Sequence, residues 1–320
     1  MTDGTAQLVD VHAHYGPTGP AVRELLAHAR VSGEYAGPEM QWDPELAIDF
    51  MDTHGIQLQL LSFPMPMPAK QVRMFNEYGA SLVSKYPDRF GLLASIPMDD
   101  PESAAIEIEY AATDLHADGF ILVTNYDGRY LGDELFEPAF AALDRHHATL
   151  FVHPVVPAGF DLTGCGLPGP LIEFPMDTAR TIVNAIWAGV LIRHPNLHFV
   201  LAHAGGVLPM LAPRILDLAP AGWVPDPASG PEIEAVAAQL RSLYADTAIA
   251  GTPGSLEPLL RMIGSDHVLF GTDFPAAPMA SIDSNIKALR DSEPFGGDAL
   301  AAITGNTRTL FPSVHSRLSA

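Results

Sequence analysis

The chain has 320 residues and a net charge of −21 at pH 7, with 48% hydrophobic and 17% charged residues. This composition is typical of a folded protein with a large buried core and excludes intrinsic disorder. The strong negative charge argues against partners that are nucleic acids or anionic membranes, because nothing would offset the repulsion between like charges.

Eight strand-like segments alternate with helix-like segments along the chain. Most of the strand-like segments are apolar almost throughout, as expected of parallel strands that are covered on both faces. The predicted strands span 8–14, 57–63, 90–96, 119–124, 149–154, 198–204, 243–249 and 268–273.

Two of the intervening helical segments begin with an aspartate followed by proline. Asp43 and Asp100 are predicted N-caps, and the proline that follows each of them suits the first helical position. Gly55 and Gly119 are predicted to lie just beyond the ends of these helices. Eight strands that alternate with helices predict an α/β protein of the (β/α)₈ TIM-barrel class.

Nothing in the sequence divides the chain into separate domains, because it contains no repeat, low-complexity tract or Pro/Gly-rich linker. We therefore expect residues 1–320 to form a single barrel domain. Two long insertions, near 15–42 and 155–175, each follow a predicted strand that ends in histidine. The carboxyl ends of barrel strands are where the active sites of such proteins lie.

Four of the thirteen histidines and one aspartate lie at the carboxyl ends of predicted strands. His12 and His14 close the first strand and point to the same side, because side chains alternate along a strand. His153 closes the fifth strand, His203 the sixth, and Asp273 the last. Neutral imidazoles and a carboxylate are suitable ligands for Zn²⁺, Mn²⁺ or Fe²⁺. The pattern predicts a metal site at the barrel mouth, with a position left for water or substrate.

The chain resembles the amidohydrolase superfamily in four motifs, which occur in the order VDVHAH, FVHP, YADTA and VLFGTDFP. Within it, the chain resembles the family typified by α-amino-β-carboxymuconate-ε-semialdehyde decarboxylase, most specifically in the block FPMDTARTIVNAIWAGVLIRHPNLHFVLAHAGGVLP. The segment NYDGRYLGDELFEPAFAAL is similar to the branch that contains 6-methylsalicylate and related hydroxybenzoate decarboxylases. The resemblance extends from VDVHAH to GNTRTLF, which is nearly the whole chain.

The resemblance assigns roles to individual residues. It implies that His203 is a catalytic histidine beside the metal, and that Arg214 reaches the site of a neighbouring subunit in a homodimer or larger homo-oligomer. The tryptophan that follows FVHP in the type enzyme has no match in VVPAGFDLTGCGLPGPLIEF, so the native substrate is expected to differ. The metal ligands that the resemblance implies are His12, His14, His153 and Asp273.

We expect one divalent metal ion per chain, with Zn²⁺ favoured and Mn²⁺ as the second candidate. Binuclear amidohydrolases commonly bridge two metals with a carboxylated lysine at the end of the fourth strand. The three lysines of this chain are Lys70, Lys85 and Lys287, and none of them ends a predicted strand. The fourth strand instead leads into Thr124 and Asn125.

The residues alone leave more than one reaction open. A single metal can activate water for hydrolysis, or it can bind a carboxylic acid that then loses CO₂, with Asp273 and His203 handling the proton. The resemblance favours a metal-dependent non-oxidative decarboxylase of an aromatic, hydroxybenzoate-like or muconate-type acid. A hydrolase or hydratase of a related ring-cleavage product is the first alternative, and a catalytically silent barrel that binds metal or a small acid is the second. Arg129 is a candidate partner for the substrate carboxylate.

The N-terminal sequence and the single cysteine favour a cytoplasmic protein. MTDGTAQ lacks the basic and apolar segments of a signal peptide, and no apolar run is long enough to span a bilayer. Cys165 excludes an internal disulfide and a cysteine-rich zinc site.

Overall fold

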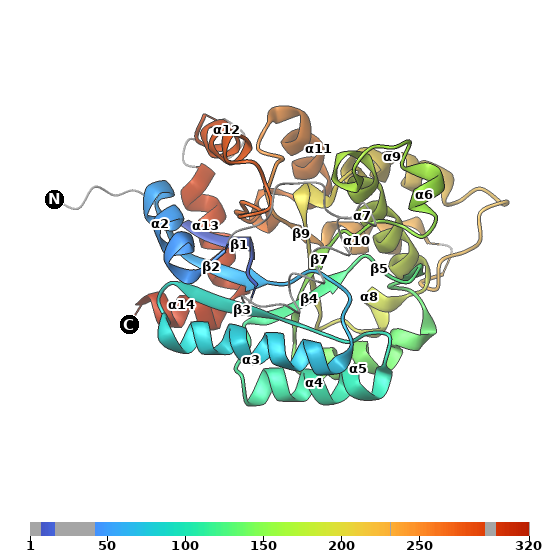
Figure 1. Ribbon diagram of the computed structural model, residues 1–320. Helices are drawn as coiled ribbons and strands as arrows, with labels where there is room; N and C mark the ends of the chain where they lie inside the picture. Colours follow the sequence, from blue (N-terminus) through green and yellow to red (C-terminus); the bar gives the residue numbers. More distant parts are fainter. Residues whose placement is uncertain (1–7, 17–41, 231, 292–298, 320) are drawn as a thin grey trace.

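The structure is a computed structural model that describes residues 8–16, 42–230, 232–291 and 299–319 (Figure 1). Most of the expected insertion at 15–42 therefore lies outside the described residues. No helix among the described residues is both long enough and apolar enough to cross a membrane.

A curled parallel sheet forms the centre of the molecule, and helices surround it (Figure 1). Adjacent strands of this sheet follow one another along the chain, which is the arrangement that strand–helix–strand repeats produce. The seven strands, in sheet order, are β1 (Leu8–His14), β2 (Ile56–Ser62), β3 (Phe90–Ser95), β4 (Gly119–Val123), β7 (Thr149–His153), β8 (His198–Leu201) and β9 (Tyr244–Ala245).

Residues 268–274 occupy the eighth position and close the barrel between β9 and β1. They form no regular strand, but isolated parallel bridges join Val268 to Ala245 and Phe274 to Ala13. Backbone hydrogen bonds run from Leu269 N to Ala245 O at 2.8 Å and from Val11 N to Phe270 O at 2.9 Å. The predicted (β/α)₈ barrel is confirmed, although the last predicted strand is reduced to these contacts.

Helices cover the outside of the barrel, and a short hairpin follows β4. The hairpin strands are β5 (Asn125–Tyr126) and β6 (Arg129–Tyr130). Three 3₁₀ turns are η1 (Glu134–Phe136), η2 (His203–Gly205) and η3 (Ser265–His267). The α-helices are α2 (Pro44–His54), α3 (Ala69–Lys85), α4 (Pro101–Thr113), α5 (Glu137–Arg145), α6 (Phe160–Thr163), α7 (Gly169–Trp187), α8 (Val190–Arg193), α9 (Leu208–Leu218), α10 (Ile233–Arg241), α11 (Pro253–Ile263), α12 (Met279–Arg290), α13 (Ala299–Leu310) and α14 (Pro312–Ser319).

The predicted helix starts are confirmed, whereas one predicted helix end is wrong. Asp43 accepts a hydrogen bond from Leu46 N at 2.8 Å, and Asp100 accepts one from Ser103 N at 3.2 Å. Gly55 follows α2 in the left-handed conformation, as expected. Helix α4, however, ends at Thr113, and Gly119 is the first residue of β4 rather than a helix cap.

The strands β8 and β9 are several residues shorter in the structure than the segments 198–204 and 243–249 that the sequence predicts. The segment 198–204 ends as a strand at Leu201, because His203 and Ala204 adopt φ values of 55° and 56° that no strand can contain. The segment 243–249 is paired only at Tyr244 and Ala245, because the next side chain, Asp246, binds backbone amides and turns the chain.

The buried apolar residues form two clusters, and the smaller one supports the floor of the barrel mouth. It includes Val9 and Val11 of β1 together with Phe151 of β7. The ring of His12 packs at 4.9 Å from the ring of Phe151. Strict alternation would put His12 on the face opposite Val11, but the pairing of β1 with β2 shifts register between Asp10 and Ala13. This irregularity allows His12 to face the same cluster as Val11, where its ring contacts Phe151.

Candidate metal centre

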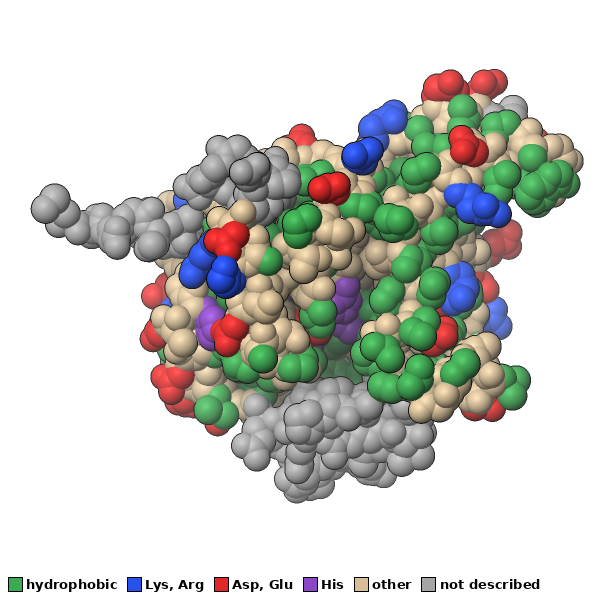
Figure 2. Space-filling model, turned by 90° about the horizontal axis from the view of Figure 1, so that it is seen from above, with side chains coloured by type: hydrophobic (Ala, Val, Ile, Leu, Met, Phe, Trp, Pro, Cys, Tyr) green, Lys and Arg blue, Asp and Glu red, His purple; other side chains and the backbone are tan. Residues whose placement is uncertain are grey.

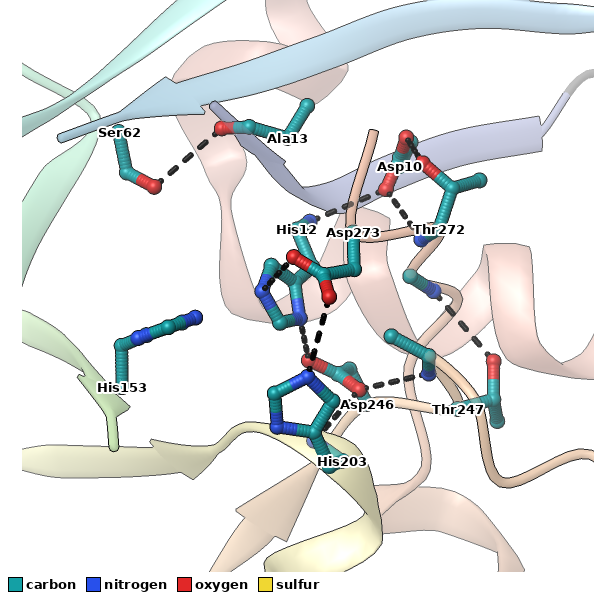
Figure 3. A network of polar contacts seen from close by, with 12 residues as sticks. Asp10, His12, Ala13, Ser62, His153, His203, Asp246, Thr247, Thr272 and Asp273 are labelled. Atoms are coloured by element: carbon teal, nitrogen blue, oxygen red, sulfur yellow. Dashed lines mark hydrogen bonds and ion pairs between the residues drawn. The ribbon is translucent and has the colours of Figure 1, made fainter. Parts of the chain in front are cut away.

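Five predicted side chains converge at the carboxyl end of the barrel. His12 and His14 come from β1, His153 ends β7, His203 begins the turn η2, and Asp273 lies on the segment that closes the barrel. Figure 3 shows His12, His153, His203 and Asp273. The ring centre of His12 lies 5.0 Å from that of His14, 5.1 Å from that of His153 and 4.9 Å from that of His203. The sequence prediction that these strand ends meet is therefore correct.

Asp273 is the central acceptor of this cluster. Its Oδ1 lies 2.9 Å from Nε2 of His14 and 3.3 Å from Nε2 of His12, and its Oδ2 lies 3.4 Å from Nε2 of His203. Burial alone would raise the pKa of Asp273, but the charge of His12 and the hydrogen bonds from the histidines hold it well below its usual range. The side chain is thus kept as a carboxylate, the form that binds a metal.

The cluster fits a single metal ion. His12, His153, His203 and Asp273 each offer one ligand atom, and these atoms lie within 4.8 Å of one another. Nε2 of His12 and Nε2 of His153 are both buried: Nε2 of His153 has no hydrogen-bond partner among the described residues, and Nε2 of His12 has none apart from its 3.3 Å contact with Oδ1 of Asp273. Buried nitrogens without partners are costly, and a cation at this point would satisfy both of them.

His14 and His203 differ in how they meet this group. Both ring nitrogens of His14 have protein partners, since Nδ1 lies 3.1 Å from Ser62 Oγ and Nε2 contacts Asp273. His203 belongs to the group of four with compatible ligand atoms. The assignment of His12, His14, His153 and Asp273 as the metal ligands, with His203 beside the metal, therefore stays a prediction.

Contacts on the far side of each ring orient the histidines. Nδ1 of His153 donates to the carbonyl oxygen of Pro154 at 2.8 Å, which leaves Nε2 with a lone pair toward the cluster. Nδ1 of His12 lies 2.7 Å from Oδ2 of Asp246. Such partners are typical of metal-binding histidines, because they fix the ring and select the ligating nitrogen.

Burial and charge set the protonation of the histidines. Burial, reinforced by the neighbouring histidines, lowers the pKa of His153 well below its usual range. Burial also lowers the pKa of His14, against the opposing effect of Asp273. His12 behaves differently: burial would lower its pKa, but the carboxylates of Asp246 and Asp273 raise it to about 10. His153 is therefore neutral and ready to bind a cation, whereas His12 must first lose a proton.

Two buried carboxylates near the cluster were not identified from the sequence. Asp10 accepts hydrogen bonds from His12 N, from Gln59 Nε2 and from both the amide and the hydroxyl of Thr272. It thereby ties β1 to β2 and to the closing segment, and burial raises its pKa to about 6 against these bonds. Asp246 lies within the YADTA motif, and its position inside a predicted apolar strand was the signal available.

The arginines lie outside this histidine cluster. Arg129 is exposed on β6, and its NH1 pairs with Asp133 Oδ2 at 3.0 Å. Arg214 is exposed on α9. Their roles in substrate binding stay predictions. Arg180 forms a structural ion pair, with NH1 at 2.6 Å from Oδ1 of the buried Asp177.

The lysine positions agree with the expectation of a single metal. Lys70 and Lys85 lie on α3, and Lys287 lies on α12, so none of them ends a strand. Thr124, which follows β4, donates its hydroxyl to Asp177 Oδ2 at 2.5 Å.

The cluster lies at the bottom of a hollow. Figure 2 shows histidine side chains recessed in this face of the molecule, with hydrophobic side chains along the sides of the depression. The ring of Phe174, on α7, lies 6.3 Å from the ring of His153. Phe274 does not line the opening as a free ring, because it is buried and stacks on Phe50 at 4.0 Å.

Comparisons with known proteins agree with this architecture. The family model described as amidohydrolase matches residues 9–307. The chain belongs to the amidohydrolase family. Among curated members, 6-methylsalicylic acid decarboxylase of Penicillium expansum is 35% identical over 288 residues, which cover 86% of this chain and 86% of that protein.

Two further amidohydrolase relatives extend the comparison. The 2-amino-3-carboxymuconate-6-semialdehyde decarboxylase of Dictyostelium discoideum is 28% identical over 250 residues, covering 73% of this chain and 67% of that protein. The structure of dihydroxybenzoic acid decarboxylase from Polaromonas sp. JS666, with bound manganese and the inhibitor 2-nitroresorcinol, superposes with a TM-score of 0.82 at 22% identity. It covers 96% of this chain and 97% of that chain, which supports the fold. The resemblance to the decarboxylase branch of the amidohydrolases is confirmed.

Proposed function

We propose that the protein is a metal-dependent carboxy-lyase that removes CO₂ from an aromatic hydroxy acid without oxidation. The observation that carries this proposal is the convergence of three histidines and Asp273, whose possible ligand atoms lie within 4.8 Å of one another. The similarity over 86% of the chain to a 6-methylsalicylic acid decarboxylase supports this reaction class. A muconate-type acid is the second substrate class.

The chain's own groups suit the proton transfer that this reaction needs. When the bond between the ring carbon and the carboxylate breaks, its electron pair stays on the ring carbon, a proton takes the place of the carboxylate, and CO₂ leaves. A bound divalent metal would supply positive charge for the substrate carboxylate and hydroxyl. Asp273, at the centre of the cluster, is the proposed carrier of the proton to the ring carbon, and His203 is proposed to hold the substrate oxygen.

The experiment supplies a panel of hydroxybenzoates, including 6-methylsalicylate, to the metal-loaded protein in D₂O and measures CO₂ release. The expected product carries one deuterium at the position that the carboxylate has left. Water addition or bond hydrolysis without CO₂ release would replace the lyase proposal with the hydrolase or hydratase alternative. A panel that is bound but left unchanged would favour a silent binding barrel.

We propose one divalent metal per chain, with Zn²⁺ and Mn²⁺ as the candidates. His nitrogens and a carboxylate oxygen are good ligands for either ion, and the three lysines lie away from the strand ends. Elemental analysis of protein grown with both metals is expected to find one equivalent of a single ion. Two equivalents would overturn the mononuclear assignment.

We propose that the active form is a homodimer or a larger homo-oligomer. Exposed hydrophobic side chains occur on three elements at one side of the barrel: Leu162 of α6 is 84% exposed, Leu171 of α7 is 62% exposed and Met210 of α9 is 66% exposed. Large exposed apolar side chains on neighbouring helices are typical of an interaction site. Arg214 lies on α9, so its side chain would be part of that interface.

Mixing two inactive variants tests the shared site. An Arg214→Ala chain lacks the arginine that would be donated, and an Asp273→Asn chain lacks the carboxylate of its own cluster. A hybrid dimer would contain one complete site, so activity should return on mixing. Demonstrated subunit exchange without recovered activity would leave Arg214 as a surface residue.

A further inference from the structure

Asp246 connects two parts of the metal centre from behind. It follows β9, its side chain is fully buried, and both of its oxygens are used (Figure 3). Oδ2 lies 2.7 Å from Nδ1 of His12. Oδ1 accepts a hydrogen bond from the backbone amide of His203 at 3.0 Å and one from the amide of Ala248 at 2.8 Å.

The chemistry of these contacts fixes the direction of the hydrogen bond to His12. A carboxylate only accepts hydrogen bonds, so Nδ1 of His12 must carry the proton of this contact. Nε2, on the other side of the ring, is buried and faces the cluster, where Oδ1 of Asp273 lies 3.3 Å away. Only a nitrogen with a free lone pair can bind a cation, so the contact with Asp246 decides that this nitrogen is Nε2.

We propose that Asp246 is a positioning residue that keeps the proton of His12 on Nδ1, directs Nε2 at the metal, and holds the turn that carries His203. The turn depends on this support because His203 and Ala204 both have positive φ values, which residues with a Cβ adopt only when their surroundings hold them there. A second contact joins the same segments, since Ala204 N donates to Asp246 O at 3.0 Å. One carboxylate thus couples the orientation of His12 to the position of His203.

The substitution Asp246→Asn tests the tautomer directly. Two backbone amides point at the position of Oδ1, so the oxygen of the new amide must remain there to accept from them. The amide NH₂ group then replaces Oδ2 and faces Nδ1 of His12. Two donors cannot share a hydrogen bond, so Nδ1 must give up its proton, and the neutral ring then carries it on Nε2. That ring presents a proton rather than a lone pair to the metal.

The proposal rests on the metal-dependent function, but its readouts need no substrate. Metal-free protein is titrated with Zn²⁺ against a chelator, and the ring nitrogens of His12 are followed by ¹⁵N NMR. Asp246→Asn should fold, lose the Nδ1 proton of His12, and bind Zn²⁺ about 10–100-fold more weakly, as is typical when a carboxylate behind a ligating histidine is changed.

Asp177→Asn is the matched control. Asp177 is also fully buried, and it accepts hydrogen bonds from Thr124, Asn125, Tyr130 and Arg180, outside the histidine cluster. This variant should lose stability yet keep the Zn²⁺ affinity of the wild type. The comparison shows whether weaker Zn²⁺ binding comes from losing any buried carboxylate or from losing the contact with His12.

Several outcomes would overturn the assignment of Asp246. These are wild-type Zn²⁺ affinity in Asp246→Asn, an Nδ1 proton on His12 that persists in that variant, or an equal loss of affinity in Asp177→Asn. If Asp246→Asn does not fold, the wild type still decides, because His12 without a proton on Nδ1 in the Zn²⁺-loaded protein would refute the proposal. A wild type that binds no metal would refute the proposed function, while the tautomer of the neutral His12 ring in the metal-free protein would still test Asp246.

Discussion

The turn that carries His203 depends on a glycine that no other residue can replace without strain. Gly206 follows η2 with φ 61° and ψ −124°, a conformation that is disfavoured for any residue with a Cβ. A Cβ built at this position would lie 2.3 Å from the carbonyl oxygen of Pro175 and 2.8 Å from its Cα. Both are backbone atoms of α7, and Val207 N donates to the same carbonyl at 3.2 Å. Neither side can move without separating the turn from the helix.

Gly206→Ala should therefore be strongly destabilising. Holding a Cβ-bearing residue in this region costs about 1–3 kcal/mol, and forcing an extra carbon into packed structure costs another ~1–3 kcal/mol. Together these effects should lower the free energy of unfolding by about 2–6 kcal/mol. Gly55→Ala is the matched control, because Gly55 has φ 72° but no atom lies within 4 Å of its Cβ position. There only the left-handed backbone is penalised, by about 1–2 kcal/mol.

Urea unfolding followed by circular dichroism measures both losses, and turnover per folded molecule measures the effect on His203. Gly206→Ala should be the less stable variant and should also turn over more slowly, whereas Gly55→Ala should keep its turnover. Equal stability losses, or a Gly206→Ala protein with full turnover, would refute the view that contact with α7 holds the turn in place.

Other substitutions separate the proposed metal ligands from the proposed catalytic groups. His153→Ala should abolish stoichiometric metal binding, whereas His198→Ala, at the exposed start of β8, should retain the metal; equal retention would refute the ligand assignment. His203→Asn should keep the fold while turnover falls about 10²–10⁴-fold, the usual contribution of a general acid–base group. A His203→Asn protein that is metal-replete, less stable and fully active would remove this histidine from the mechanism.

The parts of the site that follow from strand periodicity could be predicted from the sequence. Apolar runs located the strands β1 to β4 and β7 to within a residue or two, and the carboxyl ends of parallel strands must meet at one end of a barrel. His12, His14 and His153 are therefore correctly placed by counting along strands. His203 was expected inside a strand, and it lies instead in a left-handed turn beyond the strand end. Its presence at the site was predicted, but its backbone conformation was not.

The supporting carboxylates could not be predicted, because their roles depend on contacts between segments far apart in the chain. Asp10 and Asp246 act through hydrogen bonds to amides and rings that lie up to 262 residues away. The register shift in β1 adds to the difficulty, since strict alternation would have turned the face that carries His12 away from Val11. The surface ion pair of Arg129 with Asp133 is a further contact that the sequence interpretation did not include.

The protonation of His12 predicts how metal uptake depends on pH. Asp246 and Asp273 overcome the effect of burial and raise the pKa of His12 to about 10 in the metal-free protein. This ion pair therefore stabilises the fold fully below the unfolded pKa of about 6.5, and the stabilisation is lost as the pH rises through about 10. A metal must displace the proton on Nε2, while burial lowers the pKa of His153 and of His14 so that neither contributes a second proton. Metal affinity should thus increase about tenfold per pH unit between roughly pH 7 and 9, with one proton released per ion.

Calorimetry of Mn²⁺ binding in two buffers with different ionisation enthalpies counts the protons directly. A count near zero would mean that His12 is already neutral before the metal binds, and a count near two would mean that a second histidine of the cluster is also charged.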